Sequence, residues 1–294
     1  MKQTVEESDE VLRRLVQWAK QKPSVCAMLL TSSRANPKAI VDRFSDFDVI
    51  VVVRDVHPFF EDSAWLADFG TVLAVYRDPI GFEYGLERFR YITQYEDGLK
   101  IDFTLWPVDV LQRIAEDTEL PDELDVGYRI LIDKEHLTRQ LKPPAYQAHI
   151  PKPPTEVQYQ DNLNDFFHEA TYVAKHLWRG DLIPAKFSLD YFMKHLKLRQ
   201  MLEWRMEIDQ QWALKPGANG KGLKNVLHPE VWSELENTYV GAGIEENWQA
   251  LFRTLDLFRR VATEVGEHFR YAYPRETDER VAAYLNKIRS LNQR

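Results

Sequence analysis

Apolar and polar residues form short blocks along the first half of the chain, and these blocks predict a mixture of helices and strands. From about Glu7 to Lys20 the apolar residues recur at helical spacing, and Pro23 then ends the helix. The run 47–56 is apolar almost without a break, which is typical of a strand covered on both faces. We expect strands within 24–37, 47–56, 71–79, 91–95, 100–108 and 128–135, and short helices at 64–70 and 108–117.

The second half of the chain has a different period. Its apolar residues recur at threes and fours in 161–181, in 185–212 and from 229 through 293, which predicts long helices. Residues 214–227 contain glycines and predict a loop, but they lack the spacing of a Walker phosphate loop. Residues 141–155 contain five prolines and no periodicity, which indicates a linker. We therefore predict an α+β chain, with a mixed β-sheet and helices in a domain of residues 1–140, the linker 141–155, and an all-helical domain of residues 156–294.

Composition limits the kinds of partner and compartment. The 294 residues carry a formal net charge of −8, which disfavours nonspecific binding of nucleic acid and suits a cationic small substrate. The one cysteine, Cys26, excludes an intrachain disulfide and a cysteine-rich metal site. No stretch is apolar enough to be a signal peptide or a membrane span. We expect a cytoplasmic protein without nucleic-acid or membrane partners.

Three aspartates are the strongest candidates for chemistry. Asp46 and Asp48 stand one residue apart at the start of the apolar run, so in a strand they face the same way, about 6.5 Å apart along the backbone. Asp102 lies in an amphipathic strand whose other face is apolar, and such a carboxylate needs a cationic partner or a metal. Carboxylate oxygens select Mg²⁺, which also binds substrate phosphates. Pairs of this kind also occur in turns and solvated strand ends, so the spacing alone leaves both interpretations open.

Several strings in the chain resemble one enzyme family. They are "TSSR" (31–34), "DFDVIVVVRDV" (46–56), "WLADFG" (65–70), "YEDGLKIDFTLWPV" (95–108), "ILIDKE" (130–135) and "ATYVAKHLWRGD" (170–181). They are similar to the aminoglycoside 6-adenylyltransferases, which modify streptomycin and belong to the nucleotidyltransferase superfamily. The resemblance covers nearly the whole chain. One position departs from the family pattern, because Ser32 stands where the family usually has glycine.

The resemblance implies a mechanism and a set of roles. Asp46 and Asp48 would hold Mg²⁺ against the triphosphate of ATP, and Asp102 would share a metal and accept the proton of the attacking hydroxyl group. The product would be AMP joined to the acceptor. The residues expected to contact the nucleotide are Ser32, Ser33, Arg34, Ser45, Lys175 and Lys186. For Arg34 and the two lysines, an ordinary surface position is the alternative.

A row of acidic residues in the helical half indicates a cation-binding surface. Asp161, Asp165 and Glu169 lie four residues apart, so they share one helix face, where like charges repel. They can form a wall that binds the guanidinium or ammonium groups of an aminoglycoside. A solvated helix face is the alternative interpretation.

Three functions remain open at this point. The first is a Mg²⁺-dependent adenylyltransferase that uses ATP and acts on an aminoglycoside such as streptomycin. The second is a nucleotidyltransferase with another acceptor, which includes a different antibiotic, a protein hydroxyl group or RNA. The third is a ligand-binding relative without activity, in which the side chain of Ser32 crowds the loop where the backbone would approach the phosphates.

Overall fold

The chain folds into two compact units. The computed structural model describes residues 5–37, 39, 41–214 and 217–291. Its two units are Met1–His149 and Ile150–Arg294, and the division falls inside the proline-rich segment 141–155. The first unit contains a β-sheet with helices and the second is helical, so the predicted α+β fold class is confirmed.

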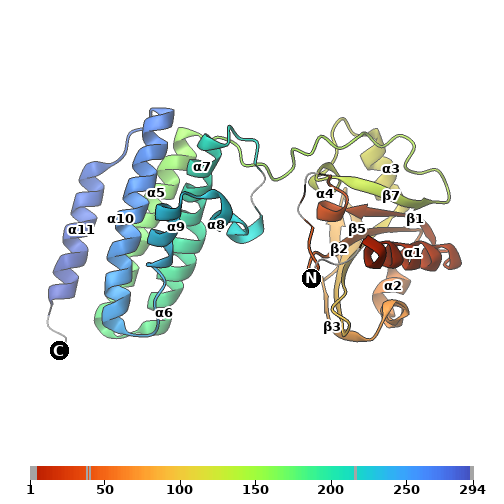
Figure 1. Ribbon diagram of the computed structural model, residues 1–294, viewed down its shortest axis with the longest axis horizontal. Helices are drawn as coiled ribbons and strands as arrows, with labels where there is room; N and C mark the ends of the chain where they lie inside the picture. The colour runs from red at the N-terminus through yellow and green to blue at the C-terminus, as the bar shows by residue number, and fades with distance from the viewer. Residues whose placement is uncertain (1–4, 38, 40, 215–216, 292–294) are drawn as a thin grey trace. The chain divides into compact units, whose positions relative to one another are not determined.

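The first unit is built on a mixed sheet of seven strands in the described residues (Figure 1). Its order is β3-β5-β6-β2-β1-β7, with the short β4 paired to β5. Strands β2 and β6 are parallel, while the other described pairs are antiparallel. The strands are β1 (Val25–Thr31), β2 (Phe47–Val53), β3 (Val72–Arg77), β4 (Gly81–Glu83), β5 (Leu86–Tyr95), β6 (Lys100–Pro107) and β7 (Tyr128–Asp133). Strand β4 was not predicted, and β5 begins five residues earlier than predicted.

Both faces of the sheet are covered, as the apolar run 47–56 predicted. Val49 and Val51 pack on one face against helix α1 and the turn η2, while Ile50 and Val52 pack on the other against α3. The alternation of side chains along β2 therefore fills two cores at once. The helical elements of this unit are α1 (Val5–Gln21), η1 (Ser32–Arg34), α2 (His57–Glu61), η2 (Ala64–Phe69), α3 (Val108–Glu116) and α4 (Asp122–Asp125).

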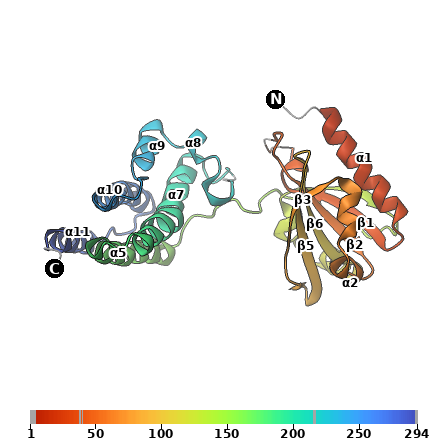
Figure 2. The same ribbon diagram turned by 90° about the horizontal axis from the view of Figure 1, so that it is seen from below.

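The second unit is a bundle of helices. A capping box of Thr155 and Gln158 begins α5, and Gly180 ends it in the left-handed conformation. Helices α10 and α11 both pack against α5 (Figure 2). No helix in the described ranges has the length and apolar character needed to cross a membrane. The helices are α5 (Glu156–Arg179), α6 (Leu182–Lys186), the π-helical η3 (Phe187–Leu198), α7 (Arg199–Asp209), η4 (Ala218–Gly220), α8 (Leu223–Val226), α9 (Pro229–Glu236), α10 (Ile244–Phe269) and α11 (Arg275–Ser290).

Two details of the helical prediction were wrong. The segment from 229 onward forms three helices, because α9 ends at Glu236 and α10 ends at Phe269. The predicted loop 214–227 contains the short helical elements η4 and α8, while its residues 215 and 216 lie outside the described residues.

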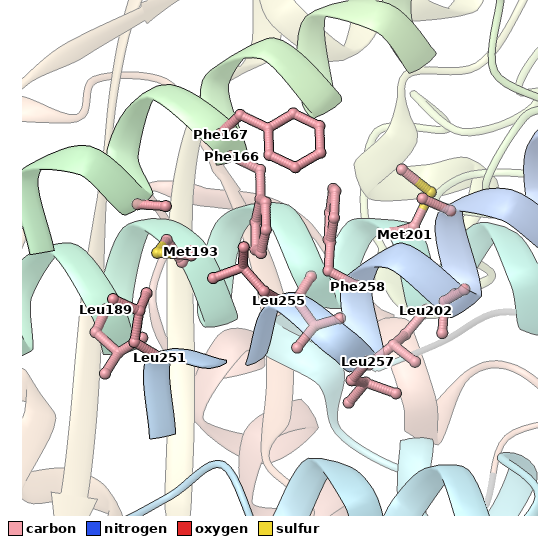
Figure 3. Close-up of a cluster of buried hydrophobic side chains, with 14 of the residues drawn as sticks. Phe166, Phe167, Leu189, Met193, Met201, Leu202, Leu251, Leu255, Leu257 and Phe258 are labelled. Atoms are coloured by element: carbon pink, nitrogen blue, oxygen red, sulfur yellow. The ribbon is translucent and has the colours of Figure 1, made fainter. Parts of the chain in front are cut away.

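A stacked pair of rings lies in the core of the helical unit. Phe166 of α5 and Phe258 of α10 lie nearly parallel, with ring centroids 3.5 Å apart and an interplanar angle of 7° (Figure 3). Both side chains are fully buried. The stack therefore joins two long helices at the centre of the bundle.

The substitution Phe258→Ala removes this contact and leaves a cavity. We expect it to lower the free energy of unfolding by about 3–5 kcal/mol, measured by denaturant titration followed by far-UV circular dichroism. The matched control is Phe187→Ala, since that ring is 56% exposed and its loss should cost less than about 1 kcal/mol. Equal losses for the two variants would contradict a central role of the stack.

Candidate active site

Parallel pairing of β2 and β6 brings two of the predicted carboxylates together. Asp48 is the register partner of Asp102, so both side chains leave the same face of the sheet on neighbouring strands. Further along this face Ile50 and Trp106 are covered by α3. Asp46 directly precedes β2, which begins at Phe47 as the sequence predicted, so only Asp48 of the pair lies in the strand. The carboxylates thus gather where the apolar covering of this face ends.

Crowding and burial raise the pKa values of these carboxyl groups. Burial, followed by the negative charges of Asp102 and Asp46, raises the pKa of Asp48 to about 6, although a hydrogen bond with the Ser32 side chain opposes the rise. Burial also raises the pKa of Asp102, against the nearby positive charge of Lys100. The Oδ1 atom of Asp102 is buried and accepts no hydrogen bond of regular geometry from the described residues. This oxygen is therefore available to a proton or to a cation.

Lys100 is a member of the site that the sequence analysis missed. Its Nζ atom donates a hydrogen bond to Asp46 Oδ2 and lies 3.4 Å from Asp102 Oδ1. Burial lowers the pKa of Lys100, but Asp46 and Asp102 outweigh burial and leave the pKa raised. The signal was its position two residues before Asp102, which places both side chains on one face of β6.

The turn after β1 brings Ser32 to the same cluster. Ser32 has a φ of 61°, in the left-handed region that favours glycine. Its backbone N–H donates to Gly127 O at 3.1 Å, and its side chain forms a hydrogen bond with Asp48. The serine therefore occupies a glycine conformation, and the bond to Asp48 compensates part of the cost.

Arg34 stabilises the backbone that carries Asp46. Its Nη2 donates to Ser45 O at 2.8 Å and its Nε donates to Asp46 O at 3.1 Å, while the guanidinium lies over the Phe47 ring. The Ser45 hydroxyl donates to Asp42 Oδ1 and accepts from Asp42 N. These contacts shape the approach to β2. The nucleotide contacts predicted for Ser33, Arg34 and Ser45 stay predictions.

The carboxylates fit a divalent ion only together with further ligands. Their oxygens are the hard donors that Mg²⁺ prefers, and the Oδ1 atom of Asp102, which has no hydrogen bond of regular geometry, is one of them. In the part of the chain that the structure describes, however, no three potential ligands are arranged to hold a metal by themselves. An ion here would complete its coordination with phosphate oxygens of a substrate.

The other predicted residues lie in the helical unit. Asp161, Asp165 and Glu169 occupy successive turns of α5, and Asp165 forms an ion pair with Lys197 at 2.6 Å. On the same helix Lys175 lies with its Nζ atom 3.9 Å from the centroid of the Tyr172 ring. Their ligand-binding roles stay predictions.

Lys186, the last residue of α6, is engaged within the same unit. Its Nζ atom forms an ion pair with Asp190 at 2.7 Å and donates a hydrogen bond to Val240 O at 2.9 Å. Binding a phosphate would require Lys186 to exchange at least one of these partners. This role also stays a prediction.

The conformation of Ser32 can be tested with two variants. Ser32→Ala removes the hydroxyl and keeps the side chain that disfavours a positive φ, whereas Ser32→Gly removes both. We expect the free energy of unfolding of Ser32→Gly to be about 1 kcal/mol higher than that of Ser32→Ala, measured by denaturant titration. Equal stability of the two variants would contradict the left-handed conformation of residue 32.

The raised pKa of Asp48 predicts a dependence of stability on pH. A carboxyl whose pKa is about 6 in the folded chain and about 3.9 in the unfolded chain destabilises the fold once it is ionised. In metal-free buffer, Asp48→Asn should therefore be more stable than the unsubstituted chain by about 2 kcal/mol above pH 6. This advantage should disappear as the pH falls from 6 to 4. The measurement is denaturant unfolding followed by tryptophan fluorescence, and an advantage that does not change with pH would contradict the assignment.

Comparisons with known proteins identify the family of the chain. Residues 5–288 match the family model described as streptomycin adenylyltransferase. The chain is 32% identical over 264 residues to an aminoglycoside 6-adenylyltransferase of Bacillus subtilis (strain 168), covering 88% of this chain and 89% of that protein. It is 29% identical to proteins of the same name from Campylobacter jejuni and Staphylococcus aureus, covering 94% and 90% of this chain and 93% of each relative.

A solved structure is also similar. It is the crystal structure of an aminoglycoside 6-adenyltransferase from Bacillus subtilis, with a TM-score of 0.47, 27% identity and coverage of 98% of this chain and 100% of that one. The family model spans nearly the whole chain, including both units. The chain therefore belongs to the streptomycin adenylyltransferase family and is a nucleotidyltransferase.

Proposed function

We propose that this enzyme transfers AMP from ATP to a hydroxyl group of an aminoglycoside, with Mg²⁺ as the metal and streptomycin as the first acceptor to test. The observation that carries the proposal is the pairing of Asp48 with Asp102 beside Asp46, within a chain that belongs to an adenylyltransferase family. The relatives that match most of its length are named aminoglycoside 6-adenylyltransferases. We assign the reaction to the cytoplasm, as the composition predicts.

The carboxylates would have separate tasks in this reaction. When bound, Mg²⁺ supplies positive charge that neutralises the phosphates, and Asp46, Asp48 and Asp102 are the residues that would hold it. Asp102 accepts the proton of the acceptor hydroxyl at Oδ1, a buried atom whose contact with Lys100 Nζ is long, at 3.4 Å. The hydroxyl oxygen forms a bond to the α-phosphorus of ATP, and the bond to pyrophosphate breaks.

The phosphates and the base of ATP require positive and polar groups. We propose that Ser32, Ser33 and Ser45 contribute polar contacts in the sheet-containing unit, and that Arg34 positions the segment before β2. Lys175 and Lys186 are the proposed cationic contacts from the helical unit. Each lysine already has a partner, Tyr172 or Asp190.

The acceptor is proposed to be cationic because of the acidic row on α5. Asp161 and Asp165 are exposed, and Glu169 is partly buried one turn further along. Ammonium or guanidinium groups of an aminoglycoside would replace Lys197 as the partner of Asp165. The net charge of −8 favours a cationic acceptor over a nucleic acid.

The proposal is tested by pyrophosphate release with ATP, Mg²⁺ and a panel of aminoglycosides. Release with streptomycin supports the full proposal, and release with only another aminoglycoside corrects the acceptor. The absence of release with every aminoglycoside would contradict the proposed reaction. Nucleotide binding without turnover would then identify a ligand-binding relative.

Asp102→Asn tests the proposed base. We expect it to lower the turnover number at least about 100-fold with little change in the melting temperature, because an amide cannot accept the proton. Glu119→Gln is the matched control, since Glu119 is an exposed carboxylate of the same unit and should retain activity. Near-normal turnover of Asp102→Asn would show that another group is the base.

A further inference from the structure

Lys100 is placed differently from an ordinary surface lysine. It is the first residue of β6, and its side chain is only 30% exposed. Its ammonium group contacts both Asp46, which directly precedes β2, and Asp102, which lies in β6. One cation of the chain thus lies between two of the three carboxylates proposed to bind metal.

Lys100 balances part of the negative charge of the cluster formed by Asp46, Asp48 and Asp102. The negative charges of Asp46 and Asp102 act on Asp48, and Lys100 opposes them. Arg90 also lowers the pKa of Asp102, but Arg90 forms an ion pair with Asp78 at 3.1 Å. The charge of Arg34 also acts on nearby aspartates, and its guanidinium donates hydrogen bonds to the backbone carbonyls of Ser45 and Asp46 and to the Ser8 hydroxyl. Lys100 donates a hydrogen bond to Asp46 and lies within ion-pair distance of Asp102, so it directly contacts two carboxylates of the cluster.

We propose that Lys100 is an internal counter-ion of the active site, which holds the carboxylates together in the metal-free enzyme and competes with a divalent ion for their oxygens. This inference rests on the proposed function for the presence of the metal. An ammonium group and a divalent ion repel each other and need the same oxygen atoms, so the ion must displace the lysine from Asp46 or Asp102. Free metal therefore binds weakly, and a metal that arrives with the negative phosphates of ATP binds more tightly.

The arrangement of the carboxylates agrees with this competition. In the described residues no three ligands are set to hold a metal, and the lysine bonds to Asp46 while a buried oxygen of Asp102 keeps no regular hydrogen bond. The carboxylate oxygens are thus arranged around the ammonium group of Lys100 and not around a metal ion. Removing the ammonium should therefore increase the affinity for the metal.

The test measures Mn²⁺ binding to the full-length chain without nucleotide, by electron paramagnetic resonance of the free ion. We expect Lys100→Met to bind Mn²⁺ about tenfold more tightly, since a neighbouring charge commonly changes such equilibria by that amount or more. Lys100→Arg keeps the charge and should stay within about twofold of the unsubstituted chain. Lys22→Met is the matched control for the loss of one positive charge, because Lys22 pairs with the exposed Asp68 in the same unit.

Melting curves give a second readout. In EDTA, Lys100→Met should melt at a lower temperature than the unsubstituted chain, because the carboxylates then repel without compensation, and Mn²⁺ should raise its melting temperature by more. The proposal is overturned if Lys100→Met binds Mn²⁺ no more tightly than the unsubstituted chain, which includes the case that neither binds. Pyrophosphate release by the unsubstituted enzyme tests the proposed function separately. An active enzyme without the affinity gain in Lys100→Met rejects only the counter-ion, and a gain without activity rejects only the proposed reaction.

Discussion

The parallel pairing of β2 with β6 is the constraint on which the active site depends. Its register sets Asp48 beside Asp102, while the residues before and after them on each strand fill the apolar cores. A shift of either strand by one residue would turn its aspartate to the opposite face, into the core that contains Phe47, Ile101 and Phe103, so burial of the strands fixes the position of the charges. The repulsion between the carboxylates is therefore held in place by the hydrophobic energy of the sheet.

The sequence predicted the face on which Asp102 lies but not which strands are neighbours in the sheet. The apolar residues at 101, 103 and 105 show that Asp102 points to the opposite face, and these three are buried as expected. That β6 lies beside β2 depends on contacts between residues far apart in the chain, which a local period does not encode. The role of Lys100 was missed for the same reason, because its partner Asp46 is 54 residues away. A lysine at a strand end is otherwise read as a surface residue.

The ends of the helices were the less predictable part of the helical unit. The spacing of threes and fours correctly indicated helices, but it did not show where α9 ends and α10 begins. Gly241 and Gly243 lie in that gap, and Arg270 ends α10 in the left-handed conformation with a φ of 60°. Arginine is an uncommon residue for this conformation, so no residue-type signal marked the end of the helix. The spacing of apolar residues thus indicated which segments are helical. The ends of the helices depend on turns whose conformation is set by packing.

The costs of this site are concentrated in a few residues at the rim of the sheet. Ser32 adopts a left-handed conformation, burial and two like charges raise the pKa of Asp48, and the buried Oδ1 atom of Asp102 has Lys100 as a partner only at 3.4 Å. Groups of this kind destabilise a fold unless the surrounding structure holds them, and they are typical of functional sites. Here β1, β2 and β6 supply that support, since β1 is buried throughout, β2 is buried apart from Asp48, and β6 buries Ile101, Phe103, Leu105 and Trp106. A sheet that was less well covered would relax by moving the carboxylates apart, and the same motion would separate the oxygen atoms that are proposed to bind a metal.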